Sequence, residues 1–379
     1  MALSSVQVEP VQPTPASAAT SSIDSLVLPN PPPLHKDWRQ YEKDANLPMP
    51  RIIEPPLERQ PRYAVECREL SERMRAAGAR DEYLSEGIVT CPITAPSSLD
   101  GYAIPVLLYS GQPDTVEDVP WVAVYIHGGG LHIGEADSED LSCRRIVKDA
   151  KLSQRGDTRL VLYSVGYRLM PLNPASICVA DCADAFRHVR SLHPRARLLL
   201  IGSSSGGELA ALVAQSVRAG RDSREGNATD NDDNDTDSGL YGVILRCPVT
   251  SDAFGGLDPY VPAYLRPLHT SAVNAAFESS LLGPMHRLVP RDGLERMPLE
   301  APAAVLQRLP RHWIQVCTND MLYSDGVCYA KALETAGVPV QVQVLSGFPH
   351  TFWLKTPWMS HALEAEKAML EGLSWVAGA

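Results

Sequence analysis

The sequence predicts an α/β fold in which a mostly parallel central sheet carries helices on both faces. Two observations support this prediction. Short apolar runs alternate along the chain with longer stretches of helical character, an order that is typical of parallel sheets. In addition, motifs of small residues directly follow two of the apolar runs, and open α/β sheets bind their ligands at the carboxyl ends of strands.

Seven apolar runs are expected to form the strands of this sheet. In chain order they are residues 103–108, 121–126, 159–163, 198–202, 242–246, 313–317 and 339–345. The later runs are separated by stretches with helical patterns at residues 181–192, 207–219 and 325–336, and a further helix is predicted at residues 63–78.

Composition narrows the class of protein. The 379 residues are 44% hydrophobic, which is enough for a sizeable core, and α/β folds of this length commonly form one unit. A net charge of −11 without a basic patch argues against nucleic acid or an anionic membrane as a partner. No apolar stretch is long enough to span a membrane, and no secretory signal is seen, so we expect a cytoplasmic protein.

Two segments have compositions typical of disorder. Residues 1–33 are rich in Pro, Ser and Ala, and we expect a disordered tail there. Residues 221–239 contain seven acids and two arginines, a net charge of −5, which predicts a solvated, disordered acidic insert. The eight cysteines lack the paired spacing of a metal site, so we expect reduced thiols, no metal and no cofactor.

The segment Gly202–Gly206 is the most informative motif. It reads Gly-x-Ser-x-Gly, it follows an apolar run, and a helical stretch follows it. The pattern alone also fits a flexible Ser/Gly loop. The strand–turn–helix context instead favours a nucleophile elbow, in which Ser204 stands on a sharp turn between glycines that leave room for the neighbouring backbone.

A second motif, His127-Gly128-Gly129-Gly130, follows the apolar run at residues 121–126. Such a glycine run can be only a flexible turn. It can also present backbone N–H groups to a developing oxyanion, because residues without a Cβ allow a substrate to approach closely. We expect the N–H groups of Gly128, Gly129, Gly130 and Ser205 to form the oxyanion hole, and His127 to order the loop.

Taken together, these motifs resemble the hormone-sensitive-lipase-like esterases, the "alpha/beta hydrolase fold-3" group of α/β-hydrolases. Tyr167–Pro171 resembles the Tyr-Arg-Leu-Ala-Pro block of that family. Asp320–Gly326 resembles the segment that carries its catalytic acid, and Gly347–Phe352 the segment that carries its histidine. The resemblance covers roughly residues 85–375 and implies an α/β-hydrolase fold with a helical cap.

The resemblance implies a catalytic triad of Ser204, Asp320 and His350, in the chain order expected for this fold. A neighbouring imidazole activates the serine hydroxyl, and a carboxylate holds that imidazole in the useful tautomer. Asp320 and His350 each follow an apolar run, which agrees with these roles, and Asp325 is a rival for the acid.

The family also implies the domain organisation. We expect a catalytic domain at residues 85–379, covered by a cap that residues 34–84 and about 251–310 form over Ser204. Four departures from the family pattern border the elbow or the pocket and leave the substrate open. They are the serines that flank Ser204, Leu131 after the glycine run, Met321 beside the acid and Thr351 after the histidine.

The predicted function is hydrolysis of a small to medium, partly apolar carboxylic ester through an acyl-enzyme, without a cofactor. The acidic insert and Pro-rich N-terminus resemble those of relatives in filamentous fungi, often beside polyketide or toxin pathways. Two alternatives remain: a thioesterase or acyltransferase with the same triad, and a ligand-binding protein on a hydrolase scaffold, like the gibberellin receptors. Those receptors have lost the histidine, so His350 argues against the latter. The expected partner is a small molecule, and a homodimer is compatible with the sequence.

Overall fold

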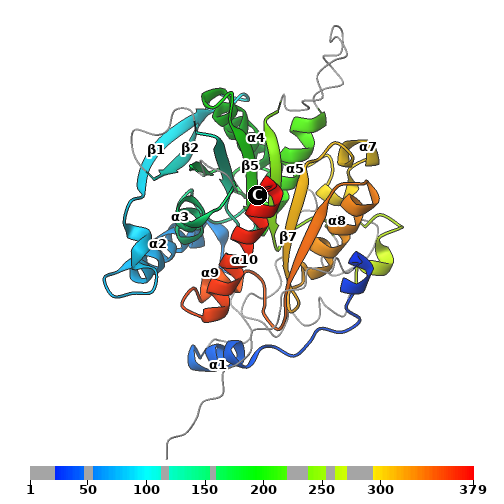
Figure 1. Cartoon of the computed structure of the whole chain (residues 1–379), viewed down its shortest axis with the longest axis horizontal. Helices are drawn as coiled ribbons and strands as arrows, with labels where there is room; N and C mark the ends of the chain where they lie inside the picture. The colour runs from blue at the N-terminus through cyan, green and yellow to red at the C-terminus, as the bar shows by residue number, and fades with distance from the viewer. Residues whose placement is uncertain are drawn as a thin grey trace, which may run out of the picture.

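The computed structural model describes residues 22–46, 54–111, 119–153, 159–219, 238–252, 261–270 and 293–379. Within these residues, eight strands form one sheet in the order β1-β2-β4-β3-β5-β6-β7-β8, with helices on both faces, which confirms the predicted fold class (Figure 1). The strands are β1 (Val89–Pro96), β2 (Ala103–Ser110), β3 (Trp121–Ile126), β4 (Leu160–Val165), β5 (Arg197–Ser203), β6 (Leu240–Arg246), β7 (Arg311–Cys317) and β8 (Val340–Leu345).

Each predicted strand and helix corresponds to an observed element, with ends that shift by a few residues. The predicted helix at 63–78 begins earlier, at Pro56, because proline is well tolerated in the first turn of a helix. None of the described helices is long and apolar enough to cross a membrane. The main helices are α1 (Lys36–Asp44), α2 (Pro56–Arg75), α3 (Asp140–Asp149), α4 (Ala175–Leu192), α5 (Ser205–Ala219), α8 (Tyr323–Thr335), α9 (Phe352–Lys355) and α10 (Ser360–Ala377).

Strand β1 was not predicted from the sequence. It lies at the edge of the sheet, pairs antiparallel with β2 and is mostly exposed, so it lacks the apolar run that marks a buried strand. Pro92 and Pro96 fit an edge position, since proline has no N–H for a second ladder.

The central strands are buried on both faces, which explains why they read as continuous apolar runs. In β3, Val122 and Val124 belong to the core under α4, α5 and α8, whereas Trp121 and Tyr125 belong to the core under α3 and α10. The two-residue alternation of a strand thus supplies both cores.

The sheet register brings the loops that carry the motifs to one edge. The six neighbouring strands β4-β3-β5-β6-β7-β8 run parallel to one another. Ile126 at the end of β3 is aligned with Gly202 near the end of β5. Cys317 at the end of β7 is aligned with Leu345 at the end of β8. The chain leaves these four strands at the same edge of the sheet.

The N-terminal strap, residues 22–33, corrects part of the predicted disordered tail. The strap begins with a short 3₁₀ turn at Ile23–Leu26, and the side chain of Ile23 is buried in the main core. In Figure 1 this blue segment runs from beside α8 to α1. The remainder of the predicted tail, residues 1–21, lies outside the described residues.

Side-chain donors near the start of α8 hold the strap. The hydroxyl of Tyr323 donates to the carbonyl of Leu26 at 2.6 Å, and the amide of Asn319 donates to the carbonyl of Pro32 at 2.8 Å. Composition did not reveal these contacts because the strap contributes backbone acceptors, which any sequence possesses.

The helices expected to form the cap pack near the site loops. In α2, Gln60 donates to the carbonyls of His132 and Met170, and in α1, Trp38 packs edge-on against Phe352. Closure over Ser204 stays a prediction. Most of the acidic insert, residues 220–237, and much of the second cap segment, residues 253–260 and 271–292, lie outside the described residues.

Candidate active site

Ser204 stands on a sharp turn between β5 and α5 with a φ of +54°, in the left-handed region that non-glycine residues seldom adopt. The two flanking positions have no room for a side chain, so they must be glycine. A Cβ on Gly202 would lie 2.1 Å from the carbonyl oxygen of Gly206, and a Cβ on Gly206 would lie 2.1 Å from that of Ile126. The crowded turn and the strained φ at Ser204 are features of a nucleophile elbow.

The structure brings Ser204, His350 and Asp320 together from three loops. The Nε2 of His350 lies 2.7 Å from the Oγ of Ser204, and its Nδ1 lies 2.6 Å from Oδ2 of Asp320. All three side chains are buried. The other oxygen of Asp320 accepts the N–H of Leu322 at 2.9 Å, which fixes the carboxylate on its turn.

The pKa of the His350 imidazole is set by two opposing effects. Burial favours the neutral ring and lowers the pKa, but the adjacent Asp320 carboxylate stabilises the imidazolium and raises it above the ordinary histidine value. Asp320 therefore stabilises the imidazolium that forms when the ring takes up a proton, and only the neutral ring can accept one. A general base needs such stabilisation, because a positive charge develops on the ring as it accepts a proton.

Asp325, the rival acid, belongs to a different cluster. One of its oxygens accepts the N–H groups of Thr250 and Ser251 at 2.7 and 2.9 Å, and the other lies 2.8 Å from Nε2 of His269. Asp325 thereby holds the loop after β6 against α8. Its carboxylate makes these contacts in place of one to His350, so geometry favours Asp320 for the acid.

The glycine run provides donors at the elbow, with one correction. The N–H of Gly128 donates to the carboxylate of Glu139 at 2.8 Å, so the prediction that it contributes to an oxyanion hole is wrong. In the described part of the chain no acceptor is seen for the N–H groups of Gly129, Gly130 and Ser205. Those three remain the candidate donors.

The glycine loop is fastened directly to the elbow. The Oγ of Ser205 accepts the N–H of Leu131 at 3.2 Å. Gly129 has a φ of +119°, and a Cβ there would lie 2.0 Å from the carbonyl oxygen of Ile133. Only glycine fits this position, which holds the loop close to Ser204.

Glu139 links both motifs and was not predicted from the sequence. One carboxylate oxygen accepts the N–H of Gly128 and, at 2.7 Å, the hydroxyl of Ser203, while the other accepts the hydroxyl of Tyr125 at 2.5 Å. The side chain is buried. Its segment is polar and lacks apolar periodicity, so it reads as solvated loop, and no pattern distinguished this acid from its neighbours.

His127 orders the glycine loop in the way the sequence suggested. Its Nδ1–H donates to the carbonyl of Gly128 at 2.7 Å, and its ring stacks on Tyr167 with centroids 4.4 Å apart. Burial lowers the pKa of His127 to about 4, so the ring is neutral at physiological pH.

Arg246 supports the elbow from β6. Its carbonyl accepts the N–H of Ser204 at 2.8 Å. Its fully buried guanidinium donates to Glu366 at 2.7 Å and to Gln315 at 2.8 Å, and it stacks over the ring of Trp353 at 4.0 Å. These contacts offset part of the cost of burying the charge, while Nη2 of Arg246 and Oε2 of Glu366 have no hydrogen-bond partner among the described residues.

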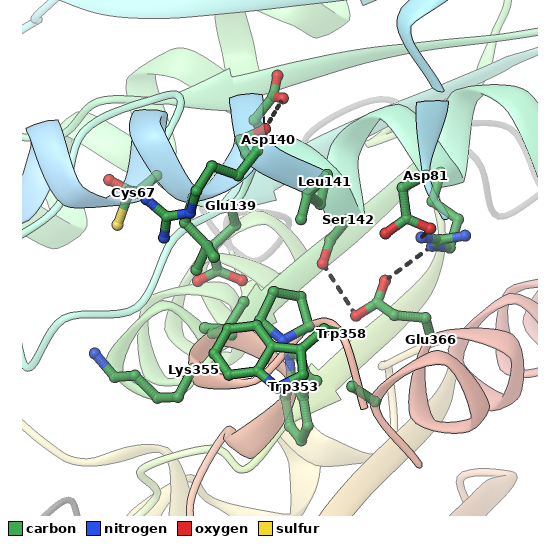
Figure 2. A pocket seen from close by; sticks show the side chains of 18 of the residues that line it. Cys67, Asp81, Glu139, Asp140, Leu141, Ser142, Trp353, Lys355, Trp358 and Glu366 are labelled. Carbon is green, nitrogen blue, oxygen red and sulfur yellow. Dashed lines mark hydrogen bonds and ion pairs between the residues drawn. The ribbon is translucent and has the colours of Figure 1, made fainter. Parts of the chain in front are cut away.

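A cavity of about 330 Å³ adjoins the site between α2, α3 and α9 (Figure 2). Glu139 lines it, together with Tyr63, Cys67 and Trp353. Ser204 is not among the described residues that line it. The hydrogen-bonded array, and not this cavity, therefore marks the candidate site.

Cys247, Asp320 and His350 place ligand atoms within 4.8 Å of one another, a spacing that could suit a metal ion. Both ring nitrogens of His350 are already engaged by Ser204 and Asp320. Burial also raises the pKa of the Cys247 thiol, which disfavours the thiolate that binds metals. This cluster is better explained by the serine–histidine–aspartate array.

A buried serine–histidine–aspartate array at the carboxyl ends of parallel strands, beside a glycine loop with open donors, defines the α/β class of hydrolases. The family profile described as alpha/beta hydrolase fold matches residues 123–354. The chain belongs to this family, and the resemblance to hormone-sensitive-lipase-like esterases is confirmed.

Similar proteins include esterases. The chain is 29% identical to an ethyl acetate hydrolase of Pseudomonas putida over 67% of this chain and 72% of that protein. It is 28% identical to the versiconal hemiacetal acetate esterase stcI of Emericella nidulans over 72% of this chain and 88% of that protein.

Two further matches bear on length and fold. The chain is 30% identical to the FAD-linked oxidoreductase pytB of Aspergillus terreus over 67% of its own length but only 29% of that protein. A hyperthermophilic esterase from the archaeon Pyrobaculum calidifontis superposes with a TM-score of 0.68 at 20% identity, covering 92% of this chain and 100% of that one. At this identity the superposition supports the shared fold.

Proposed function

We propose that this protein is a serine carboxylesterase in which Ser204, His350 and Asp320 form the catalytic triad. The observation that carries the proposal is the pair of short contacts through His350, 2.7 Å to the Ser204 hydroxyl and 2.6 Å to the Asp320 carboxylate. The histidine joined to the serine also supports turnover over the alternative of a binding-only protein.

The proposed reaction proceeds through an acyl-enzyme. His350 accepts the proton of Ser204 as its oxygen attacks the ester carbonyl, and Asp320 stabilises the imidazolium. The N–H groups of Gly129, Gly130 and Ser205 donate to the oxyanion. His350 then gives the proton to the leaving alcohol, and a water molecule, deprotonated by the same ring, hydrolyses the acyl-enzyme.

We propose a small to medium, partly apolar ester as the substrate and secondary metabolism as the setting. The similarity to two fungal proteins, the esterase stcI of Emericella nidulans and pytB of Aspergillus terreus, supports this setting at low identity. The Leu, Pro and Tyr content of the expected second cap segment, about residues 251–310, supports a partly apolar substrate. A thioester would use the same triad.

Exchange of Ser204 tests the proposal. Ser204→Ala should lower ester turnover by about 10³-fold or more and should abolish labelling by a fluorophosphonate probe. Ser203→Ala is the matched control, since the Ser203 hydroxyl faces Glu139, and it should still be labelled. Labelling of the Ser204→Ala protein at the wild-type rate would contradict the assignment.

A substrate panel separates the esterase from the thioesterase. Turnover of matched esters and thioesters, each with short and long acyl chains, should favour the esters, and product analysis with an added alcohol should show hydrolysis over transfer. Faster turnover of every thioester than of its ester partner would assign the thioesterase function.

A further inference from the structure

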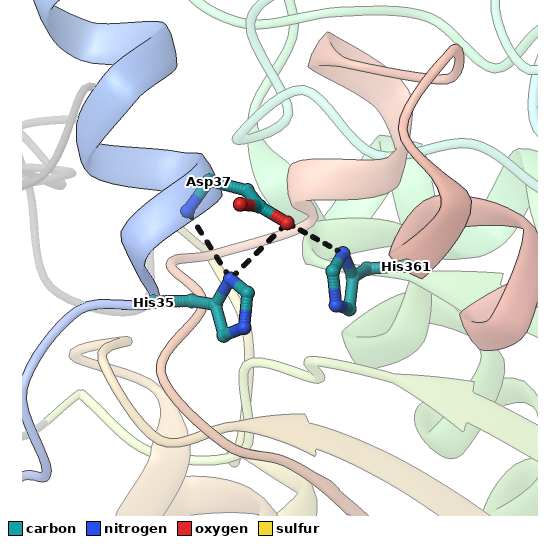
Figure 3. Close-up of side chains that lie close together, drawn as sticks. All are labelled: His35, Asp37 and His361. Atoms are coloured by element: carbon teal, nitrogen blue, oxygen red, sulfur yellow. Dashed lines mark hydrogen bonds and ion pairs between the residues drawn. The ribbon is translucent and has the colours of Figure 1, made fainter. Parts of the chain in front are cut away.

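Two histidines and one aspartate meet on the side of the molecule where α1 begins. His35 and Asp37 lie at the start of α1, and His361 lies at the start of α10, more than 320 residues later (Figure 3). One ligand atom from each of the three residues lies within 4.8 Å of the others. Their side chains are 30%, 45% and 26% exposed, so an ion from solution can reach them.

The separations suit a shared ion better than hydrogen bonds. Oδ2 of Asp37 lies 3.7 Å from Nδ1 of His35 and 3.6 Å from Nδ1 of His361. Both distances are too long for hydrogen bonds. Ligand atoms held about 2.1 Å from a tetrahedral ion lie roughly 3.4 Å apart, close to the observed spacing.

Neighbouring groups orient the two imidazoles before any ion binds. The rings of His35 and His361 both pack on Phe348, with centroids 5.1 and 5.0 Å away. The backbone N–H of His35 donates to the carbonyl of Gly347 at 2.8 Å, and the ring Nδ1 of His35 accepts the backbone N–H of Asp37 at 3.2 Å, a long hydrogen bond that the ion would replace. The ring is thereby held with its Nδ1 lone pair on the side of Asp37. Oriented ligands lose little freedom on binding.

We propose that His35, Asp37 and His361 form a binding site for a divalent zinc ion. Two imidazoles and one carboxylate are a ligand set that zinc uses, with a fourth position filled by water. Magnesium and calcium prefer all-oxygen sites and should bind far more weakly. The ion would tie α1 to α10 and thereby stabilise the folded state.

Binding of Zn²⁺ to the tag-free protein is measured by titration calorimetry and by the shift in melting temperature. We expect saturable binding of one ion and a melting temperature that rises with Zn²⁺ concentration, because an ion that binds only the folded state stabilises it. Mg²⁺ at the same concentrations should leave the melting temperature unchanged.

Two variants locate the ion. His35→Asn removes the imidazole but keeps an acceptor that caps α1, and His361→Gln removes the imidazole from α10. Each should weaken Zn²⁺ binding at least about tenfold, the loss that follows even when a supporting group of a metal site is removed. His188→Gln on α4 is the matched control and should bind Zn²⁺ like the wild-type protein.

Three results would overturn the proposal. They are the absence of saturable Zn²⁺ binding up to about 1 mM, equal affinity in the two variants and the wild-type protein, and Zn²⁺ inhibition of hydrolysis that both variants retain. The last result would place the ion at Cys247, Asp320 and His350. Ser204→Ala should bind Zn²⁺ normally, so this test is independent of the proposed esterase activity.

Discussion

The two aspartates that compete for the role of the acid are distinguished by what each one contacts. Asp320→Asn should lower kcat by roughly 10⁴-fold, because an amide favours the wrong tautomer of His350. Asp325→Asn should instead lower the melting temperature and leave the turnover of the folded enzyme within about tenfold, since this carboxylate holds the loop after β6. Steady-state kinetics with the opposite ranking would transfer the role to Asp325.

The same substitution changes the pH dependence of hydrolysis. Asp320 raises the pKa of His350, and only the neutral ring can accept the serine proton, so activity is lost as the pH falls through that pKa. In Asp320→Asn the pKa of His350 should fall, and the acidic limb of the kcat/KM profile should move to lower pH. If the acidic limb did not move, the pKa that it reports would belong to a group other than His350.

Glu139 is proposed as a positioning residue for the glycine loop. Glu139→Ala would leave the N–H of Gly128 and the hydroxyls of Ser203 and Tyr125 without their acceptor. We expect kcat to fall by about 10²-fold, with a smaller change in KM, because a loosened loop mainly weakens donation to the oxyanion.

Glu139→Gln is the control, since its amide oxygen can still accept from Gly128, and it should recover most of the activity. If KM rose and kcat stayed constant in Glu139→Ala, Glu139 would act on substrate binding instead.

At the residue scale, the sequence predicted the groups with distinctive local patterns. Ser204 and the glycine run stand in short motifs, and Asp320 and His350 follow apolar runs. Glu139 and the engagement of the Gly128 N–H could not be predicted. They depend on one carboxylate reaching two loops at once, which is a property of the packed structure.

At the scale of elements, α10 approaches the sheet through a glycine. A Cβ on Gly372 would lie 2.4 Å from the indole ring of Trp313, which is buried on β7. Gly372→Ala should gain about 1 kcal/mol of helix propensity, but overpacking a fixed ring costs about 1–3 kcal/mol. We expect the clash to dominate and the free energy of unfolding to fall, as measured by chemical denaturation.

A double-mutant cycle tests the cause of this loss. Trp313→Leu destabilises the protein by itself but removes the ring that the new methyl group would meet. In that background Gly372→Ala should become neutral or stabilising. An equal loss in both backgrounds would show that the contact with Trp313 is not responsible.

The strands and helices show the limits of prediction by pattern. The buried strand β3 has the predicted bounds because its whole run is apolar. The exposed edge strand β1 was missed, since its order comes from pairing with β2 and its own residues carry no apolar run. Helices α1, α3 and α10 were not predicted either.

At the scale of the whole molecule, the strap should contribute to stability. A protein that begins at residue 34 should melt at a lower temperature than one that begins at residue 22, because the shorter chain loses the contacts with Tyr323 and Asn319 and the buried Ile23. Equal melting temperatures would show that the strap adds no stability. Comparing these two chains isolates residues 22–33.

The strap also has a consequence for the order of folding during synthesis. Its hydrogen bonds to Asn319 and Tyr323 join residues 287 and 297 positions apart. The ribosome therefore releases the strap long before its partners exist, an interval of roughly 15–60 s at 5–20 residues per second. The strap can attach only after Asn319 and Tyr323 have been made, when β1 to β7 have already been synthesised.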